Sequence, residues 1–197
     1  MPARRPVPPS VFADQHEHVR LLERCLGDDN LPIDIRAARA LILLFGINTS
    51  RVLCIRADQL AERDGETYLT LDQHELIIPP RLAVLLARLS APRSRSTLPP
   101  NPSAPKLLFP RRALGQPVAA GSIGSRVKRY GINARGGRNT ALIGMAADLR
   151  APVLADLLGL HIATGVRWAK YAKRDWESYL ADRRSTARRT PRPDPSA

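Results

Sequence analysis

The stretch that decides the fold is Gly136-Gly-Arg-Asn-Thr-Ala-Leu142, and two further blocks follow it along the chain. The second block is Leu154-Ala-Asp-Leu-Leu-Gly-Leu-His161, and the third is Arg167-Trp-Ala-Lys-Tyr171. Apolar residues recur at helical spacing around all three blocks. The helices predicted from this spacing span residues 119–130, 139–149, 152–158 and 162–184.

Ahead of these blocks, the sequence carries signals for four further helices. Ser10 can cap a helix over residues 10–26, and Gly46 can close a second helix over residues 35–45, which is apolar on most sides and therefore expected to be central. Asn48-Thr-Ser can cap a third helix. A fourth is predicted over residues 81–89, where Pro79-Pro80 at the entry is tolerated because first-turn N–H groups lack helical partners.

Two short β-type runs, Tyr68–Leu71 and Leu76–Ile78, lie between the third and fourth predicted helices. Asp64-Gly65 ahead of them is a turn signal. Together they predict a small antiparallel hairpin or a three-stranded sheet. The expected fold class is therefore α+β, mainly helical, with one small antiparallel sheet.

Composition predicts one folded unit with two tails. Hydrophobic residues make up 44% of the 197-residue chain, which is enough for a core. Residues 1–9 and 185–197 are rich in proline and arginine, so we expect disordered tails there, with the folded domain over residues 10–184. Proline and serine crowd residues 90–105, which we expect to form an exposed loop.

A formal net charge of +13 is the strongest compositional signal. Such an excess attracts polyanions over long range, which favours nucleic acid first and an anionic membrane surface second. The longest apolar stretch, Ala37–Ile47, is too short to span a membrane and contains Arg39, and the N-terminus lacks the apolar part of a secretory signal. We therefore expect a cytoplasmic, nucleoid-associated protein without membrane contact.

Metal and cofactor signatures are absent from the sequence. Cys25 and Cys54 have no further cysteine or histidine at ligand spacing, so we expect free thiols rather than a disulfide or a zinc site. The histidines His16, His18 and His74 also lack ligand spacing. No phosphate-cradling glycine loop or hydrolase motif occurs either. We expect neither metal nor cofactor.

The three blocks resemble the catalytic domain of the tyrosine recombinases, or phage integrases. Members of that family carry His-x-x-Arg-His-Thr, then Leu-Leu-Gly-His, then a helix with a nucleophilic tyrosine. Upstream, Leu43–Ile55 resembles the family segment Tyr-x-Thr-Gly-Leu-Arg, and the small sheet and Leu108-Phe-Pro follow in the expected places. The resemblance covers about residues 31–184 and implies an integrase-type catalytic domain within residues 10–184.

In that family a tyrosine attacks a DNA phosphodiester, giving a 3′-phosphotyrosyl link. Two arginines, a lysine and two histidine or tryptophan donors stabilise charge and protonate the leaving oxygen. Arg138 matches the second arginine. The first falls on Asn48, with Arg51 one helical turn further on as the alternative.

Other family positions are changed. The histidine three positions before the second arginine is Arg135, and the histidine of Leu-Leu-Gly-His is Leu160, with His161 displaced by one. Gln73-His74 occupies the region of the family lysine. The nucleophile position falls on Trp168, which cannot attack phosphorus. The resemblance thus implies a degenerate active site.

Tyr171, one helical turn after Trp168, is the only plausible replacement nucleophile, with Tyr179 less well placed. The alternative for Tyr171 is a ring that serves packing alone. Arg138 has an alternative as well, an ion pair with Asp156 inside the fold. Arg135, Arg167 and Lys170 have the alternative of a solvated face.

The predicted function is duplex DNA binding by a catalytically degenerate member of the recombinase family, linked to DNA recombination or integration. The candidate catalytic residues, if any activity remains, are Arg138 and Tyr171. The candidate DNA-binding residues are Arg51, Arg135, Arg138, His161, Arg167 and Lys170. Two alternatives stay open: an active recombinase that uses Tyr171, and an RNA-binding or ribosome-associated protein.

Partner predictions follow from the same resemblance. Active family members carry an additional N-terminal helical domain that closes a clamp on DNA, and about 30 residues precede the matched region here. We therefore expect a chain without that domain, whose partners besides duplex DNA are a full-length recombinase or a second copy of itself.

Overall fold

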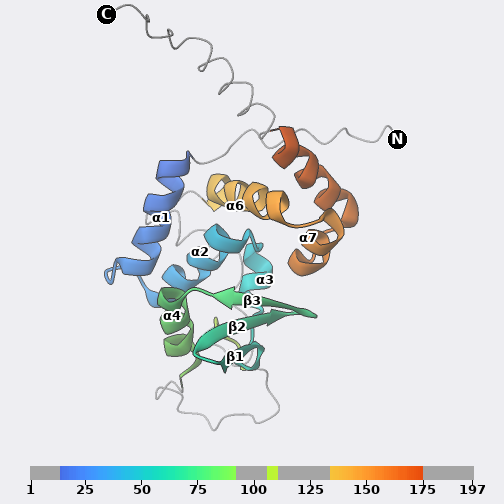
Figure 1. The fold of residues 1–197 in the computed structure, drawn as a ribbon. Helices are drawn as coiled ribbons and strands as arrows, with labels where there is room; N and C mark the ends of the chain where they lie inside the picture. Colours follow the sequence, from blue (N-terminus) through green and yellow to red (C-terminus); the bar gives the residue numbers. More distant parts are fainter. Residues whose placement is uncertain (1–13, 92–105, 111–133, 175–197) are drawn as a thin grey trace, which may run out of the picture. The chain divides into compact units, whose positions relative to one another are not determined.

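A computed structural model of the chain describes residues 14–91, 106–110 and 134–174 (Figure 1). It divides into two compact units, residues 1–142 and 143–197, which are described separately. The predicted tails, the predicted helix over residues 119–130 and most of the predicted loop over residues 90–105 lie outside the described residues.

In the first unit, helix α1 spans Gln15–Gly27. Its N-cap is Asp14, whose carboxylate accepts a hydrogen bond from the His16 N–H at 3.1 Å. The prediction that Ser10 caps this helix was wrong, because Asp14 already satisfies a free N–H of the first turn. The other end of α1 is held by Arg36, which donates to the carbonyl oxygens of Cys25 at 3.0 Å and Leu26 at 2.8 Å.

Helix α2, Ile33–Phe45, is central to the first unit and contacts α1, α3 and α4. Nine of its residues, from Ile35 to Leu43, are buried, which confirms the expectation drawn from its apolar sides. Gly46 closes the helix with φ of 66°, a conformation that favours glycine. A Cβ on Gly46 would also lie 2.8 Å from Cγ of Leu142, so the site admits no side chain without displacement.

Helix α3 is the short segment Thr49–Leu53. Asn48 is its N-cap, and the Asn48 side-chain oxygen accepts a hydrogen bond from the Arg51 N–H at 2.8 Å. The cap predicted from Asn48-Thr-Ser is confirmed. A single 3₁₀ turn, η1 (Ala57–Gln59), leads from α3 into the sheet.

The sheet has three antiparallel strands in the order β1-β2-β3: Leu60–Arg63, Glu66–Leu71 and His74–Ile78. Asp64 and Asp72 adopt positive φ in the two tight turns, where aspartate is tolerated better than most residues. Alternate residues point to one buried face, and α4 (Pro80–Ser90) packs its leucines near β2. The buried residues of this layer are Leu69, Leu71, Leu76, Ile78, Leu82, Leu85, Leu86 and Leu89.

Residues 106–110 join the same unit through a bridge between Leu107 and Arg56 and a 2.9 Å hydrogen bond from the Leu108 N–H to the Ile55 carbonyl. Helix α6, Ala134–Asp148, begins in the first unit and continues into the second. It starts five residues earlier than predicted, because Gly136 and Gly137 are helical rather than helix-breaking. A Cβ on Gly137 would lie 2.4 Å from Cδ2 of the buried Leu43, so glycine allows the close packing of α6 on α2.

The second unit holds the rest of α6, then α7 (Ala151–Leu158), and then a helix over residues 162–174. Gly159 ends α7 with φ of 60°. The buried residues of this unit include Leu154, Leu158 and Trp168. The chain is thus mainly helical with one small antiparallel sheet in its described residues, which confirms the predicted fold class.

Two other kinds of feature are absent from the described residues. No helix there combines the length and the apolar character that a bilayer crossing needs. No group of three or more histidine, cysteine, aspartate or glutamate side chains is arranged there to hold a metal ion.

Candidate nucleic-acid interface

Arg138 is the half-buried cation of the first turns of α6. Its Nε is buried and has no hydrogen-bond partner among the described residues. Burial lowers the pKa of Arg138 from its ordinary value, and no carboxylate among the described residues acts against that shift. A desolvated guanidinium without a counter-ion is costly, so this position favours an anionic ligand.

The surroundings of Arg138 explain its burial. Gly137 brings α6 against Leu43 of α2. A Cβ added at Gly137 would also lie 3.7 Å from Nδ1 of His18. His18, on α1, is itself half-buried, and burial is the main cause of the lowered pKa of its imidazole. The start of α6 thus packs against α1 and α2, which accounts for the partial burial of Arg138.

Arg135 lies three residues before Arg138 on α6, so the two positions share a face of the helix. The side chain of Arg135 lies outside the described part of the chain. Its predicted role as a phosphate ligand stays a prediction.

Asn48 and Arg51 were the two candidates for the first family arginine. The Asn48 side chain caps α3, which is a structural use for it. The Arg51 side chain is 19% exposed and donates from Nη2 to Oδ2 of Asp72 at 2.5 Å. Arg51 therefore brings a cation to the surface beside the turn between β2 and β3.

His161 stands at the start of the helix over residues 162–174 in the second unit. Its Nδ1 accepts a hydrogen bond from the Ala163 N–H at 3.2 Å, and its carbonyl oxygen accepts from Thr164 at 2.7 Å. The imidazole is exposed. The Nδ1 bond requires a lone pair on that atom, so the neutral ring can offer a donor only from Nε2.

Trp168 and Tyr171 form an aromatic pair on that helix. Trp168 is 6% exposed, and its ring centroid lies 5.8 Å from that of the half-buried Tyr171, with the rings 83° apart. This edge-to-face arrangement is a favourable packing geometry. A packing role for Tyr171 thus has direct support, whereas its position relative to Arg138, in the other unit, stays untested.

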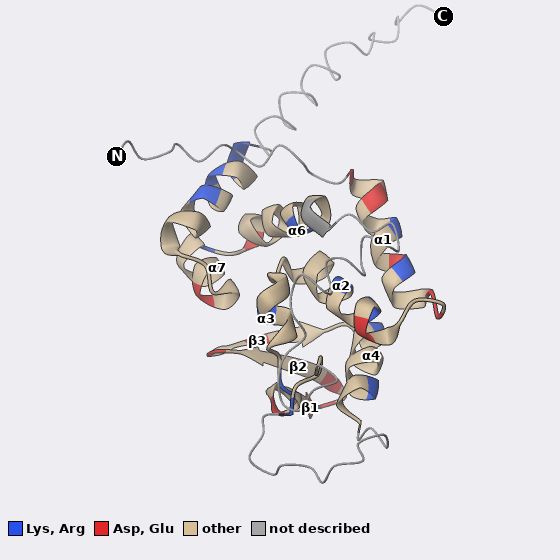
Figure 2. Cartoon of the chain, turned by 180° about the vertical axis from the view of Figure 1, so that it is seen from behind, with Lys and Arg blue, Asp and Glu red and all other residues tan. Residues whose placement is uncertain are grey.

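The same helix has a cationic face. Arg167 is half-buried and Lys170 and Arg174 are exposed, at spacings of three and four residues that place them on one side. Lys173 adds a fourth cation, and residues 162–174 contain no acidic residue. Figure 2 shows these Lys and Arg positions on the helix that follows α7. Arg174 was missed at the sequence level, although its spacing from Arg167 was readable there.

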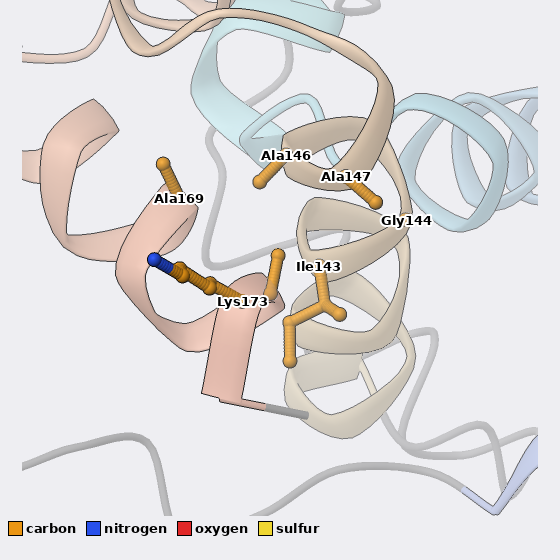
Figure 3. Close-up of a pocket in the computed structure, with 7 residues that line it drawn as sticks. Ile143, Gly144, Ala146, Ala147, Ala169 and Lys173 are labelled. Carbon is orange, nitrogen blue, oxygen red and sulfur yellow. The ribbon is translucent and has the colours of Figure 1, made fainter. Parts of the chain in front are cut away.

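A groove of about 590 Å³ lies in the second unit and is lined mostly by small apolar residues (Figure 3). Lys173 supplies its charged group, and Ala169 and Ala172 line it from the same helix. The remaining lining residues belong to α6: Ile143, Gly144, Ala146 and Ala147. None of the predicted site residues lines this groove.

The predicted site residues fall into two groups. The first unit holds Arg51, Arg135 and Arg138, and the second holds His161, Arg167, Lys170 and Tyr171. The residues of each group lie on helices and loops of a single unit. Their convergence on one DNA ligand remains a prediction, as does the alternative pairing of Arg138 with Asp156 of the second unit.

Comparison with known proteins yields similarity at the level of structure only. No known protein family model and no curated protein sequence matches the chain. Among solved structures, XerA recombinase superposes with a TM-score of 0.58 at 16% identity, over 91% of this chain and 66% of that one.

Two structures with DNA are also similar. XerH site-specific recombinase bound to its difH substrate matches with a TM-score of 0.55 at 13% identity, over 87% of this chain and 52% of that one. The Tn1549 transposon integrase in complex with circular intermediate DNA matches with a TM-score of 0.55 at 16% identity, over 82% and 61%.

The chain spans about half to two thirds of the length of these structures. The similarity extends over most of this chain. It includes the helices and the small antiparallel sheet described above. The expectation drawn from the sequence blocks is confirmed for the fold: this chain has the catalytic-domain fold of the tyrosine recombinases and integrases.

Proposed function

We propose that the chain binds duplex DNA through phosphate contacts, in a process of DNA recombination or integration, and that it does not cleave the DNA. The observation that carries this proposal is Arg138, a desolvated guanidinium whose Nε lacks a hydrogen-bond partner among the described residues. A phosphate supplies both the negative charge and the acceptor oxygens that this group lacks.

The cationic helix face supports the same proposal. Arg167, Lys170 and Arg174 repeat along one side of the helix, as a row of phosphates would require. Contacts of this kind orient a protein on the duplex but read no sequence, so we expect weak sequence preference. The net charge of +13 adds long-range attraction.

The absence of cleavage rests on three positions. Trp168, at the family nucleophile position, is buried and has no group that can attack phosphorus. Asn48, at the position of the first arginine, caps α3. Tyr171 stacks edge to face on Trp168, which accounts for its presence without chemistry. Attack on a phosphate needs the nucleophile and the charge stabilisation in one place.

Replacing both Arg135 and Arg138 by alanine is expected to weaken duplex binding and to reduce the slope of log K against log salt by about one to two phosphate equivalents. The measurement is fluorescence anisotropy of a short labelled duplex across a salt series. The matched control is Arg81→Ala with Arg88→Ala, which removes the same charge from the exposed face of α4.

Equal effects of the two double variants would show that only net charge matters and would contradict the proposed site. Thermal unfolding of both variants checks that folding is retained. If Arg138→Ala unfolds the chain, Arg167→Ala with Lys170→Ala tests the second group in the same assay. A duplex RNA competitor that displaces the DNA at equal concentration would favour the RNA-binding alternative.

The chain is expected to form no covalent link to DNA, because no nucleophile stands at the family position. The test is incubation with nicked duplexes that trap a phosphotyrosyl intermediate, followed by denaturing electrophoresis. An SDS-resistant adduct that vanishes in Tyr171→Phe but persists in Tyr179→Phe would contradict this expectation and establish Tyr171 as a relocated nucleophile.

A further inference from the structure

Arg51 differs from Arg36, a more deeply buried arginine that also forms an ion pair. Each of the three guanidinium nitrogens of Arg36 donates a hydrogen bond, to Cys25, Asp29 or Leu26. Arg51, with a side chain 19% exposed, makes one side-chain hydrogen bond to a described residue, from Nη2 to Asp72. Since a guanidinium carries five N–H donors, Arg51 has further donors without a partner among the described residues.

Asp72 is an exposed partner on a separate element. It lies 21 residues from Arg51 in the turn that joins β2 to β3, and its side chain is 65% exposed. Its φ of 54° suits aspartate, asparagine or glycine. The turn conformation therefore accounts for aspartate, asparagine or glycine at position 72. It does not require the negative charge of the aspartate.

An ion pair with a single hydrogen bond and an exposed carboxylate contributes little to folding, because water already solvates the Asp72 charge well. A phosphate can form two parallel charge-assisted bonds to the same guanidinium, which is a stronger arrangement. A phosphate near Arg51 would also be repelled by the Asp72 carboxylate. The Asp72 side chain thus occupies the place that an anionic ligand of Arg51 would take.

We infer that Arg51 is a phosphate-binding position that Asp72 masks in the free chain, so that DNA must displace an internal carboxylate to reach it. This inference rests on the proposed DNA binding and adds to it a residue that limits affinity. The masking predicts that removal of the Asp72 charge strengthens DNA binding and adds one phosphate contact.

The test compares Asp72→Asn with Asp58→Asn by anisotropy of a labelled duplex over a salt series. Asp58 is a matched control, because it is also 65% exposed and paired with an arginine, Arg56, at 2.8 Å. Asp72→Asn is expected to bind roughly three- to tenfold more tightly than Asp58→Asn, with a salt slope steeper by about 0.9. The double variant Arg51→Gln, Asp72→Asn is expected to lose this gain.

Asp72→Gly, which also tolerates positive φ, must reproduce the effect of Asp72→Asn. Equal affinities of Asp72→Asn and Asp58→Asn, or weaker binding by Asp72→Asn, would overturn the masking while leaving DNA binding intact. If the unmodified chain does not bind duplex DNA, the proposed function is wrong, and the masking with it.

Discussion

Gly165→Ala is expected to lower the free energy of unfolding by about 1–3 kcal/mol, the usual cost of forcing an extra carbon into a packed site. A Cβ on Gly165 would lie 2.6 Å from the carbonyl oxygen of Ala151 and 3.1 Å from Cβ of Ala155. The nearest obstacle is backbone, which cannot rotate away as a long side chain would. The helix over residues 162–174 would have to move away from α7.

Gly144→Ala is the matched control. Gly144 is also helical and in the second unit, but a Cβ there meets nothing within 4 Å. Alanine at that position is expected to stabilise the chain by up to about 1 kcal/mol, since glycine is the poorer helix former. Urea unfolding of both variants gives the comparison. Equal stabilities of the two variants would show that α7 and the last described helix do not pack as closely as the structure has them.

The elements predicted well from the sequence are those with local signals. Asn48 caps α3 through a hydrogen bond to a residue three positions away, and Gly46 closes α2 through its own backbone angle. The sheet followed from two short β-type runs and the turn signal Asp64-Gly65. Each of these signals lies within a few residues of the structure it determines, so no tertiary information was needed.

The start of α6 was predicted too late because its signal is tertiary. Gly136-Gly137 favours a break in an isolated helix. In the folded chain, Gly137 meets Leu43 of α2, and the contact is possible only without a Cβ. Packing against a segment more than 90 residues earlier overrides the local preference, and a single sequence carries no sign of it.

The sequence block identified Arg138 as a candidate site residue. It could not show how the side chain of Arg138 is buried. The missing hydrogen-bond partner of its Nε and its burial depend on how α1 and α2 enclose the start of α6. The pair between Arg51 and Asp72 joins residues 21 positions apart and was equally hidden. Arg174, by contrast, continues the spacing of Arg167 and Lys170 and was accessible from sequence alone.

The salt dependence of duplex binding is the second large effect expected of this chain. Five cations are proposed to reach phosphates: Arg135, Arg138, Arg167, Lys170 and Arg174. Five such contacts give a slope of about −4.5 for log K against log salt. Affinity should therefore fall roughly 500-fold between about 50 and 200 mM salt.

Titration of the unmodified chain with a labelled duplex over that salt range tests the proposed DNA binding most directly. The expected result is saturable binding at low salt, with the steep linear loss just described and little difference between unrelated duplex sequences. Saturable binding is required first, so that the slope reports a defined complex. No binding at about 50 mM salt, or a slope flatter than about −2, would contradict duplex binding through these arginines and lysines.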